Sequence, residues 1–174
     1  MHPYRKTLCA LLLALPLAAA ALEGDRREPI HVRADRVELD NRQGIGTYRG
    51  NVTLDQGSLH LEADVLVVHR GADGLDRIEA EGRPVRFRQR PDGAAADIEG
   101  EALRLEYSTA REQLLLQGTA SVRQGGDLFS GERIEYDTQQ SRVQASGQDK
   151  DGGDGRVHAI IQPRQSAPAA ESKP

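Results

Sequence analysis

Cysteine is almost absent: the one cysteine, Cys9, lies within an apolar run near the amino terminus. Arg5 and Lys6 precede this run and four alanines ending at Ala21 follow it, which is the pattern of a cleaved secretory signal. The run is shorter than the ~20 residues that a membrane-spanning helix needs, which argues against an uncleaved anchor. We therefore predict that residues 1–21 are a signal peptide and that the exported chain lacks disulfide and thiol chemistry.

Aromatic residues are nearly as scarce, with no tryptophan, two phenylalanines and four tyrosines. A chain of this composition builds its interior from valine, leucine and isoleucine, which favour β-strands. Such an aliphatic lining suits lipid tails better than sugar rings, which stack on aromatic faces. Positive charge is also low, because 21 lysines and arginines remain beyond the signal peptide against 27 acidic residues. An acidic exported chain is a poor nucleic-acid binder, so we exclude that class.

What the chain does contain is a pattern of about thirty residues that occurs four times. Each unit has a small residue before an acid, with apolar residues alternating on both sides and the alternation slipping by one position at the acid. One extra residue in a strand is typical of a β-bulge, which bends the strand. We predict a corner at each acid, with the apolar face kept inward, and a glycine in each return strand. The acids are Asp35, Asp64, Glu101 and Glu132, and the glycines are Gly50, Gly82, Gly118 and Gly147.

Turn residues separate the apolar stretches at short, regular intervals, which predicts an all-β fold. Four corner-turned units stack into a roll with two open ends, whose first and last strands expose unpaired backbone groups. The predicted organisation is a flexible segment at 22–29, a folded domain at 30–162 and a disordered tail rich in Pro, Ala and Ser at 163–174.

No catalytic or metal-binding pattern is present. The histidines are scattered without ligand spacing, so we expect no metal, no cofactor and no enzymatic activity. The repeated acids serve the repeat itself, by accepting hydrogen bonds from the backbone at each bend. Arg83, Arg86, Arg88 and Arg90 form a basic stripe, which is either a solvated outer face or a surface for anionic headgroups.

The inward aliphatic face has two interpretations that composition alone leaves open. It is either the closed, dry core of a β-solenoid scaffold or a groove for lipid. A glycan-modifying enzyme with an unrecognised site is a third alternative.

Six stretches together resemble the OstA-like family of periplasmic lipopolysaccharide-transport proteins, over about residues 29–162. They are Pro29–Asp35, Tyr48–Val52, Gln56–Asp64, Glu81–Pro84, Gly100–Tyr107 and Gly118. The resemblance implies a semi-open antiparallel β-jelly roll in the periplasm whose interior holds the acyl chains of lipopolysaccharide. It also implies a bridge between the two membranes, although other components of the same pathway share the fold.

The resemblance further implies that Ile30 and Val32 lie at the lipid entry and the amino-terminal docking edge, and that Phe87, Leu105 and Tyr107 lie in the groove. With the other inward positions, the candidate lipid-binding residues are Ile30, Val32, Val52, Leu54, Phe87, Leu103, Leu105, Tyr107, Leu116, Ile134 and Tyr136. The candidate partner edges are Ile30 and Val32 at one end, and Val157 and Ile160 at the other. The implied partners are an LptC-type subunit of the inner-membrane export complex at the first edge, an LptD-type amino-terminal domain of the outer-membrane translocon at the second, and further copies of the chain joined head to tail.

Overall fold

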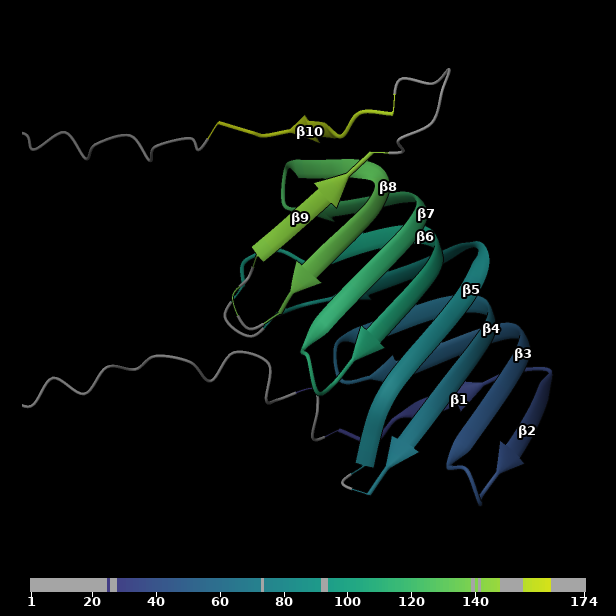
Figure 1. Ribbon diagram of the computed structural model, residues 1–174. Helices are drawn as coiled ribbons and strands as arrows, with labels where there is room; N and C mark the ends of the chain where they lie inside the picture. Colours follow the sequence, from purple (N-terminus) through teal and green to yellow (C-terminus); the bar gives the residue numbers. More distant parts are fainter. Residues whose placement is uncertain are drawn as a thin grey trace, which may run out of the picture.

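A computed structural model describes residue 25 and residues 28–72, 74–91, 94–138, 140, 142–147 and 155–163. This part of the chain forms a single antiparallel sheet that is rolled on itself (Figure 1). The prediction of an all-β roll is confirmed. Its strands are β1 (His31–Arg33), β2 (Arg36–Asp40), β3 (Ile45–Gln56), β4 (Leu59–Gly71), β5 (Gly74–Gln89), β6 (Ile98–Ser108), β7 (Gln113–Gln124), β8 (Asp127–Asp137), β9 (Arg142–Ser146) and β10 (His158–Ile160). Within the described ranges, no helix is long and apolar enough to cross a membrane.

The sheet bends into two halves because its long strands continue through a corner. The strands pair in the order β1, β3, β4, β5, β6, β7, β8, β10. The two short strands β1 and β2 pair with opposite ends of β3, and β9 and β10 pair with opposite ends of β8. Each half therefore begins and ends on a short strand that has one neighbour in the described sheet. These short strands lie at the two ends of the stack (Figure 1).

Register shifts mark the corner in each strand. Asp64 in β4 and Glu132 in β8 fall at such shifts, as the repeat predicts, and Asp35 lies between β1 and β2. The third unit differs from the prediction, because its corner residue is Leu103: Ala102 pairs with Val85 and Arg104 with Glu81, which leaves Leu103 unpaired toward β5.

The assignment of Glu101 as the third corner acid was therefore wrong by two residues. Because the strand alternates, this error also reverses the expected direction of Leu103. Its side chain is 48% exposed, whereas Ala102 and Leu105 on either side are buried. Leu103 occupies the position that carries an acid in the other three units, so it lies outside the core.

The core consists of the inward residues of both halves. Among the residues that the structure describes, sixteen apolar ones are buried, and they are Val52, Leu54, Leu61, Leu66, Ile78, Ala80, Val85, Phe87, Ile98, Ala102, Leu105, Leu114, Leu116, Ala120, Val122 and Ile134. Fifteen of them are aliphatic, as the scarcity of aromatic residues predicts. All sixteen come from β3 to β8, so the interior runs through the stack of long strands.

Candidate functional site: an apolar interior with two open ends

The interior is built from rows of cross-strand partners that run along the roll, perpendicular to the strands. One row follows the second half of the sheet and contains Val37, Tyr48, Leu66, Ala80, Leu105, Leu116, Ile134 and Ala145. A parallel row contains Leu39, Gly46, Val68, Ile78, Tyr107, Leu114, Tyr136 and Val143. Neither row contains a charged residue. An apolar surface therefore continues from one end of the roll to the other.

The opposite half supplies a third inward row, which faces the first two. It contains Val32, Leu54, Leu61, Phe87, Gly100, Val122, Phe129 and Ala159. In this row Phe87, one of two phenylalanines, is paired directly with the glycine at position 100. The phenyl ring lies in the space that a side chain at position 100 would occupy.

Between the two halves lies a cavity of about 100 Å³. Ten apolar residues line it, namely Leu54, Leu59, Leu61, Ile78, Phe87, Ile98, Leu105, Tyr107, Leu114 and Tyr136. Four polar residues, Asp25, Gln56, Gln89 and Thr138, complete the lining. Gln56 ends β3, Gln89 ends β5 and Thr138 follows β8, so the polar residues belong to strand ends rather than to the middle of the rows.

A second hollow, of about 300 Å³, lies at the end of the roll formed by β1 and β2. Ile30, Val32, Leu39, Tyr48 and Val68 are among the residues that line it. Because no further strand covers this end in the described chain, Val37 and Leu39 are 54% and 56% exposed although they belong to the inward rows. The apolar interior is thus open at its amino-terminal end.

The structure separates the predicted site residues into groups. Leu54, Phe87, Leu105, Tyr107 and Tyr136 line the cavity, and Ile30 and Val32 line the hollow at the end. Val52, Leu116 and Ile134 point inward but are completely buried in the core. Leu103 alone points outward, which corrects its prediction. Of the two residues predicted for the carboxyl-terminal edge, Ile160 lies in β10 and Val157 directly precedes it, and both are exposed.

Sequence reasoning missed half of the apolar residues that line the cavity, and all four of the polar ones. Leu59, Leu61, Ile78, Ile98 and Leu114 line the cavity but were not among the candidates. All five carry the same period-two alternation as the residues that were chosen, so the signal was present. What the alternation cannot show is which inward residues border an opening, since this depends on how closely the two halves approach.

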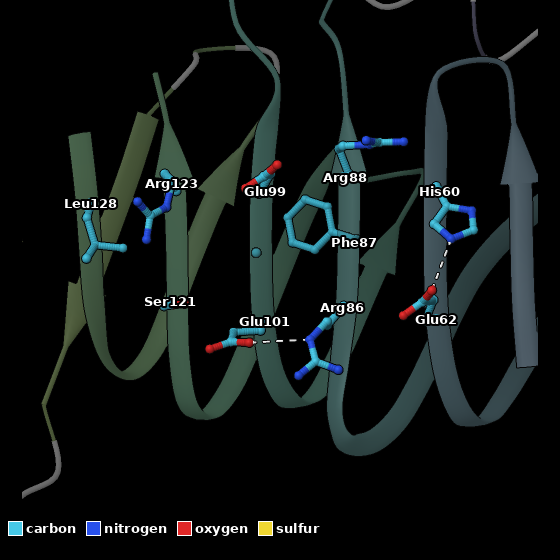
Figure 2. A pocket seen from close by; sticks show the side chains of 11 residues that line it. His60, Glu62, Arg86, Phe87, Arg88, Glu99, Glu101, Ser121, Arg123 and Leu128 are labelled. Atoms are coloured by element: carbon cyan, nitrogen blue, oxygen red, sulfur yellow. Dashed lines mark hydrogen bonds and ion pairs between the residues drawn. The ribbon is translucent and has the colours of Figure 1, made fainter. Parts of the chain in front are cut away.

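The outer face of the roll also has a hollow, of about 390 Å³, but its lining is mainly charged (Figure 2). Arg86 pairs with Glu101 at 3.7 Å across β5 and β6, and His60 lies 3.4 Å from Glu62 on β4. Acidic and basic residues alternate across neighbouring strands here, as in the row of Arg88, Glu99 and Arg123. This surface is mainly a solvated charge ladder, although Phe87 and Gly100 of the third inward row also line the hollow.

His60 and Asp55 form a close pair on this face, with Nδ1 2.6 Å from Oδ1. The hydrogen bond to Asp55 raises the pKa of His60, with a smaller contribution from Glu62, against the opposing effect of burial. The same hydrogen bond lowers the pKa of Asp55, and Arg33 lowers it further. No group of three or more metal-ligating side chains occurs in the part of the chain that the structure describes.

Comparisons with known proteins agree with this architecture. Residues 31–142 match the family model of the LptA/(LptD N-terminal domain) LPS transport proteins. The lipopolysaccharide export system protein LptH of Pseudomonas aeruginosa is 33% identical over 153 residues, covering 86% of this chain and 87% of that protein. The lipopolysaccharide export system protein LptA of Escherichia coli strain K12 is also 33% identical, over 91% of this chain and 84% of that protein.

A solved structure gives the same result. The crystal structure of LptH, described as the LptA-homologous periplasmic component of the lipopolysaccharide transport device of P. aeruginosa, superposes with a TM-score of 0.72. It covers 80% of this chain and 99% of that chain, at 33% identity. The roll is therefore the open β-jelly roll of a lipopolysaccharide-transport domain. The chain belongs to the LptA/LptD amino-terminal domain family of lipopolysaccharide transport proteins.

Proposed function

We propose that this protein carries lipopolysaccharide across the periplasm, with the acyl chains held between the two halves of the roll. The observation that carries the proposal is the continuity of the inward rows. They are apolar on every long strand, and at the amino-terminal end they reach solvent at Val37 and Leu39. A lipid tail in this interior would meet similar aliphatic side chains at each step, so no single position would bind it much more tightly than the next.

The energetics of the lipid favour such a carrier. Each methylene that leaves water contributes ~0.8 kcal/mol, so a lipid with several acyl chains cannot cross an aqueous space unaided. No bond has to be made or broken for this task, so the proposed role is binding and transfer, without enzymatic chemistry. The cavity of about 100 Å³ is smaller than the ~300–1,000 Å³ of ordinary ligand pockets. We therefore expect the two halves to move apart when lipid enters.

The sheet edges support assembly in one direction. The order from β1 to β10 contains an odd number of antiparallel steps, so β10 runs opposite to β1. A second copy that places its β1 beside β10 of the first would continue an antiparallel sheet and cover both edges. By the same logic, β1 and β2 would accept the LptC-type subunit, and β9 and β10 the LptD-type domain. Ile30, Val32, Val157 and Ile160 would then be buried at the joints.

The proposal is tested by photocrosslinking to lipopolysaccharide in cells. A photoreactive residue at Tyr107, which lines the cavity, should crosslink to lipopolysaccharide, whereas one at the neighbouring Glu106 on the outer face should not. Phe87 and Arg88 form a second pair of this kind on β5. Equal crosslinking at the inward and outward positions, or no crosslinking at either inward position, would refute lipid carriage in the interior.

A closed scaffold is the second candidate, and the fully buried Val52, Leu116 and Ile134 favour it. These residues pack as in an ordinary core, and a dry core needs no ligand. Mass spectrometry of the purified native protein distinguishes the two functions. Co-purifying lipopolysaccharide is expected of the carrier, and its absence from a folded, freshly isolated protein is expected of the scaffold.

A further inference from the structure

The mouth of the apolar cavity is occupied by a carboxylate of the chain itself. Asp25 lies beside the turn between β3 and β4, where its Oδ1 accepts the backbone N–H of Ser58 at 2.9 Å. Its Oδ2 accepts the hydroxyl of Ser58 and, at 3.3 Å, the side-chain amide of Gln89. A single anionic group thus receives three hydrogen bonds at the end of two strands, while also lining the cavity.

The donors are held in place without Asp25. Ser58 lies between two strands of the sheet, and its hydroxyl oxygen accepts the backbone N–H of Arg90 at 3.0 Å. Gln89 ends β5 and is paired with Ile98 on β6. Burial raises the pKa of Asp25, but the hydrogen bonds from Ser58 and Gln89 outweigh it, so that the pKa lies below its ordinary value. The donor set therefore favours an anion.

The surroundings of Ser58 provide room for a larger anion. On its outer side lies a hollow of about 460 Å³, lined by Ser58, Leu59, His60, Arg88 and Arg90, and also by Gly57 and the carboxylates of Asp55 and Asp97. Leu59, the neighbour of Ser58, lines both the apolar cavity and this polar hollow, which contains two arginines. Arg90 is held by Asp97 at 2.6 Å, whereas no ion pair among the described residues holds Arg88, whose cross-strand neighbours are His60 and Glu99. An amphiphile with an anionic headgroup matches this arrangement.

We propose that Ser58 and Gln89 form a binding site for a phosphate group on the lipid whose acyl chains enter the cavity, and that Asp25 occupies this site when no lipid is bound. The proposal rests on the proposed function, because it assigns the headgroup end of the same lipid. A phosphate offers three acceptor oxygens where the carboxylate offers two, so it can replace Asp25 at all three donors and also reach Arg88. Displacement of Asp25 would couple binding of the headgroup to opening of the mouth.

The experiment compares three probes: bisphosphorylated lipid A, the same lipid A with its phosphates removed, and inorganic phosphate. Binding is measured by titration, together with the amide chemical shift of Ser58. The full exported chain is used as wild type, Asp25→Ala and Ser58→Ala. Glu28→Ala is the matched control, because it removes an acid from the same segment. The hydrogen bond from the Gln56 side chain goes to the backbone oxygen of Glu28, which the substitution retains.

We expect Asp25→Ala to bind phosphorylated lipid A about tenfold more tightly than wild type, since the competing carboxylate is gone, and to gain less affinity for the dephosphorylated lipid. Ser58→Ala should lose the preference for the phosphorylated lipid, and Ser58→Thr, which keeps the hydroxyl, should retain it. Glu28→Ala should behave as wild type. A melting temperature equal to that of wild type shows that each variant is folded.

Equal affinity of all variants for both lipids would overturn the phosphate site while leaving lipid carriage intact. Failure of every variant and of wild type to bind either lipid would instead overturn the proposed function, and the site with it. If inorganic phosphate shifts the Ser58 amide of Asp25→Ala with the same midpoint as lipid A, the assignment to a lipid headgroup is wrong and the site is one for free phosphate.

Discussion

The ring of Phe87 on β5 lies over Gly100 on β6, in the space that a side chain at position 100 would need. Phe87 also lines the apolar cavity, so the free space next to Gly100 determines how far the ring projects into the interior. A methyl group on Gly100 would overlap the ring and push it toward the cavity.

Gly100→Ala is therefore expected to lower lipopolysaccharide capture and to reduce the free energy of unfolding by about 1–3 kcal/mol, as overpacking does. Capture and denaturant unfolding are measured on the same preparation. Gly71→Ala is the matched control, because a methyl group there meets only ordinary van der Waals contact, 3.7 Å from Cβ of Asp76. Unchanged capture and stability in Gly100→Ala would show that the Phe87 ring can shift without cost to packing or to lipid binding.

A second prediction concerns two leucines that are two residues apart on β6. Leu103→Asp introduces an acid at the exposed corner position that is acidic in the other three units, so stability should change by no more than about 0.5 kcal/mol. Leu105→Asp introduces a carboxylate at a side chain that is 4% exposed, which should cost roughly 2–5 kcal/mol and abolish lipid capture.

The melting temperature and the lipid capture of both variants test whether Leu103 and Leu105 point in the same direction. The sequence repeat predicted that both leucines point inward and would therefore respond alike. An equal loss of stability in the two variants would support that prediction and contradict the corner at Leu103. A folded Leu105→Asp variant that binds lipid normally would remove Leu105 from the site.

The pH dependence of stability provides a third prediction. The folded-state pKa of His60 lies above the unfolded value of ~6.5, because Asp55 and Glu62 favour the imidazolium, while Arg88 is its cross-strand neighbour on the other side. The stabilisation is fully present below the unfolded pKa and is lost as pH rises through the folded pKa. The side chain is 37% exposed, so solvent screening keeps the effect below about 1 kcal/mol.

Denaturant unfolding of wild type and His60→Asn between pH 5.5 and 8.5 measures this contribution. The stability difference between the two proteins should decrease as pH rises above ~6.5. A difference that is constant across this range would show that the imidazolium is not stabilised in the fold. Asp55 acts in the opposite direction, because its lowered pKa gives stability that is lost as pH falls through the folded value.

The fourth prediction tests the carboxyl-terminal edge. Removing residues 157–174 deletes β10, which pairs with β8 through only three residues, so the long strands and the cavity should remain folded. Self-association, measured by sedimentation velocity at rising protein concentration, should be lost because the proposed joint is missing.

Removing only residues 164–174 is the control for this truncation, since it leaves β10 in place. It should associate as the full exported chain does. If the shorter protein without β10 still associates to the same extent, the joint between copies does not involve β10.

The sequence by itself determined the local rules of this protein. Period-two alternation identified Leu54, Phe87 and Leu105 as inward residues, because alternate side chains of a strand must point to opposite faces. The slip at Asp64 and Glu132 identified corners, since an extra residue in a strand can only be accommodated by a bulge. The scarcity of aromatic residues predicted the aliphatic character of the interior.

Only the tertiary structure decided the position of the third corner. Glu101 follows a glycine and Leu103 an alanine, so both fit the pattern of a small residue before the corner, and the pairing of β6 with β5 chooses Leu103. The tertiary structure also decided which inward residues line a cavity and which are packed solid, because this depends on the distance between two halves that are far apart in sequence. The contact of Asp25 with Ser58 and Gln89 is of the same kind: no local pattern brings residues 25, 58 and 89 together, and only the rolled sheet places them at one mouth.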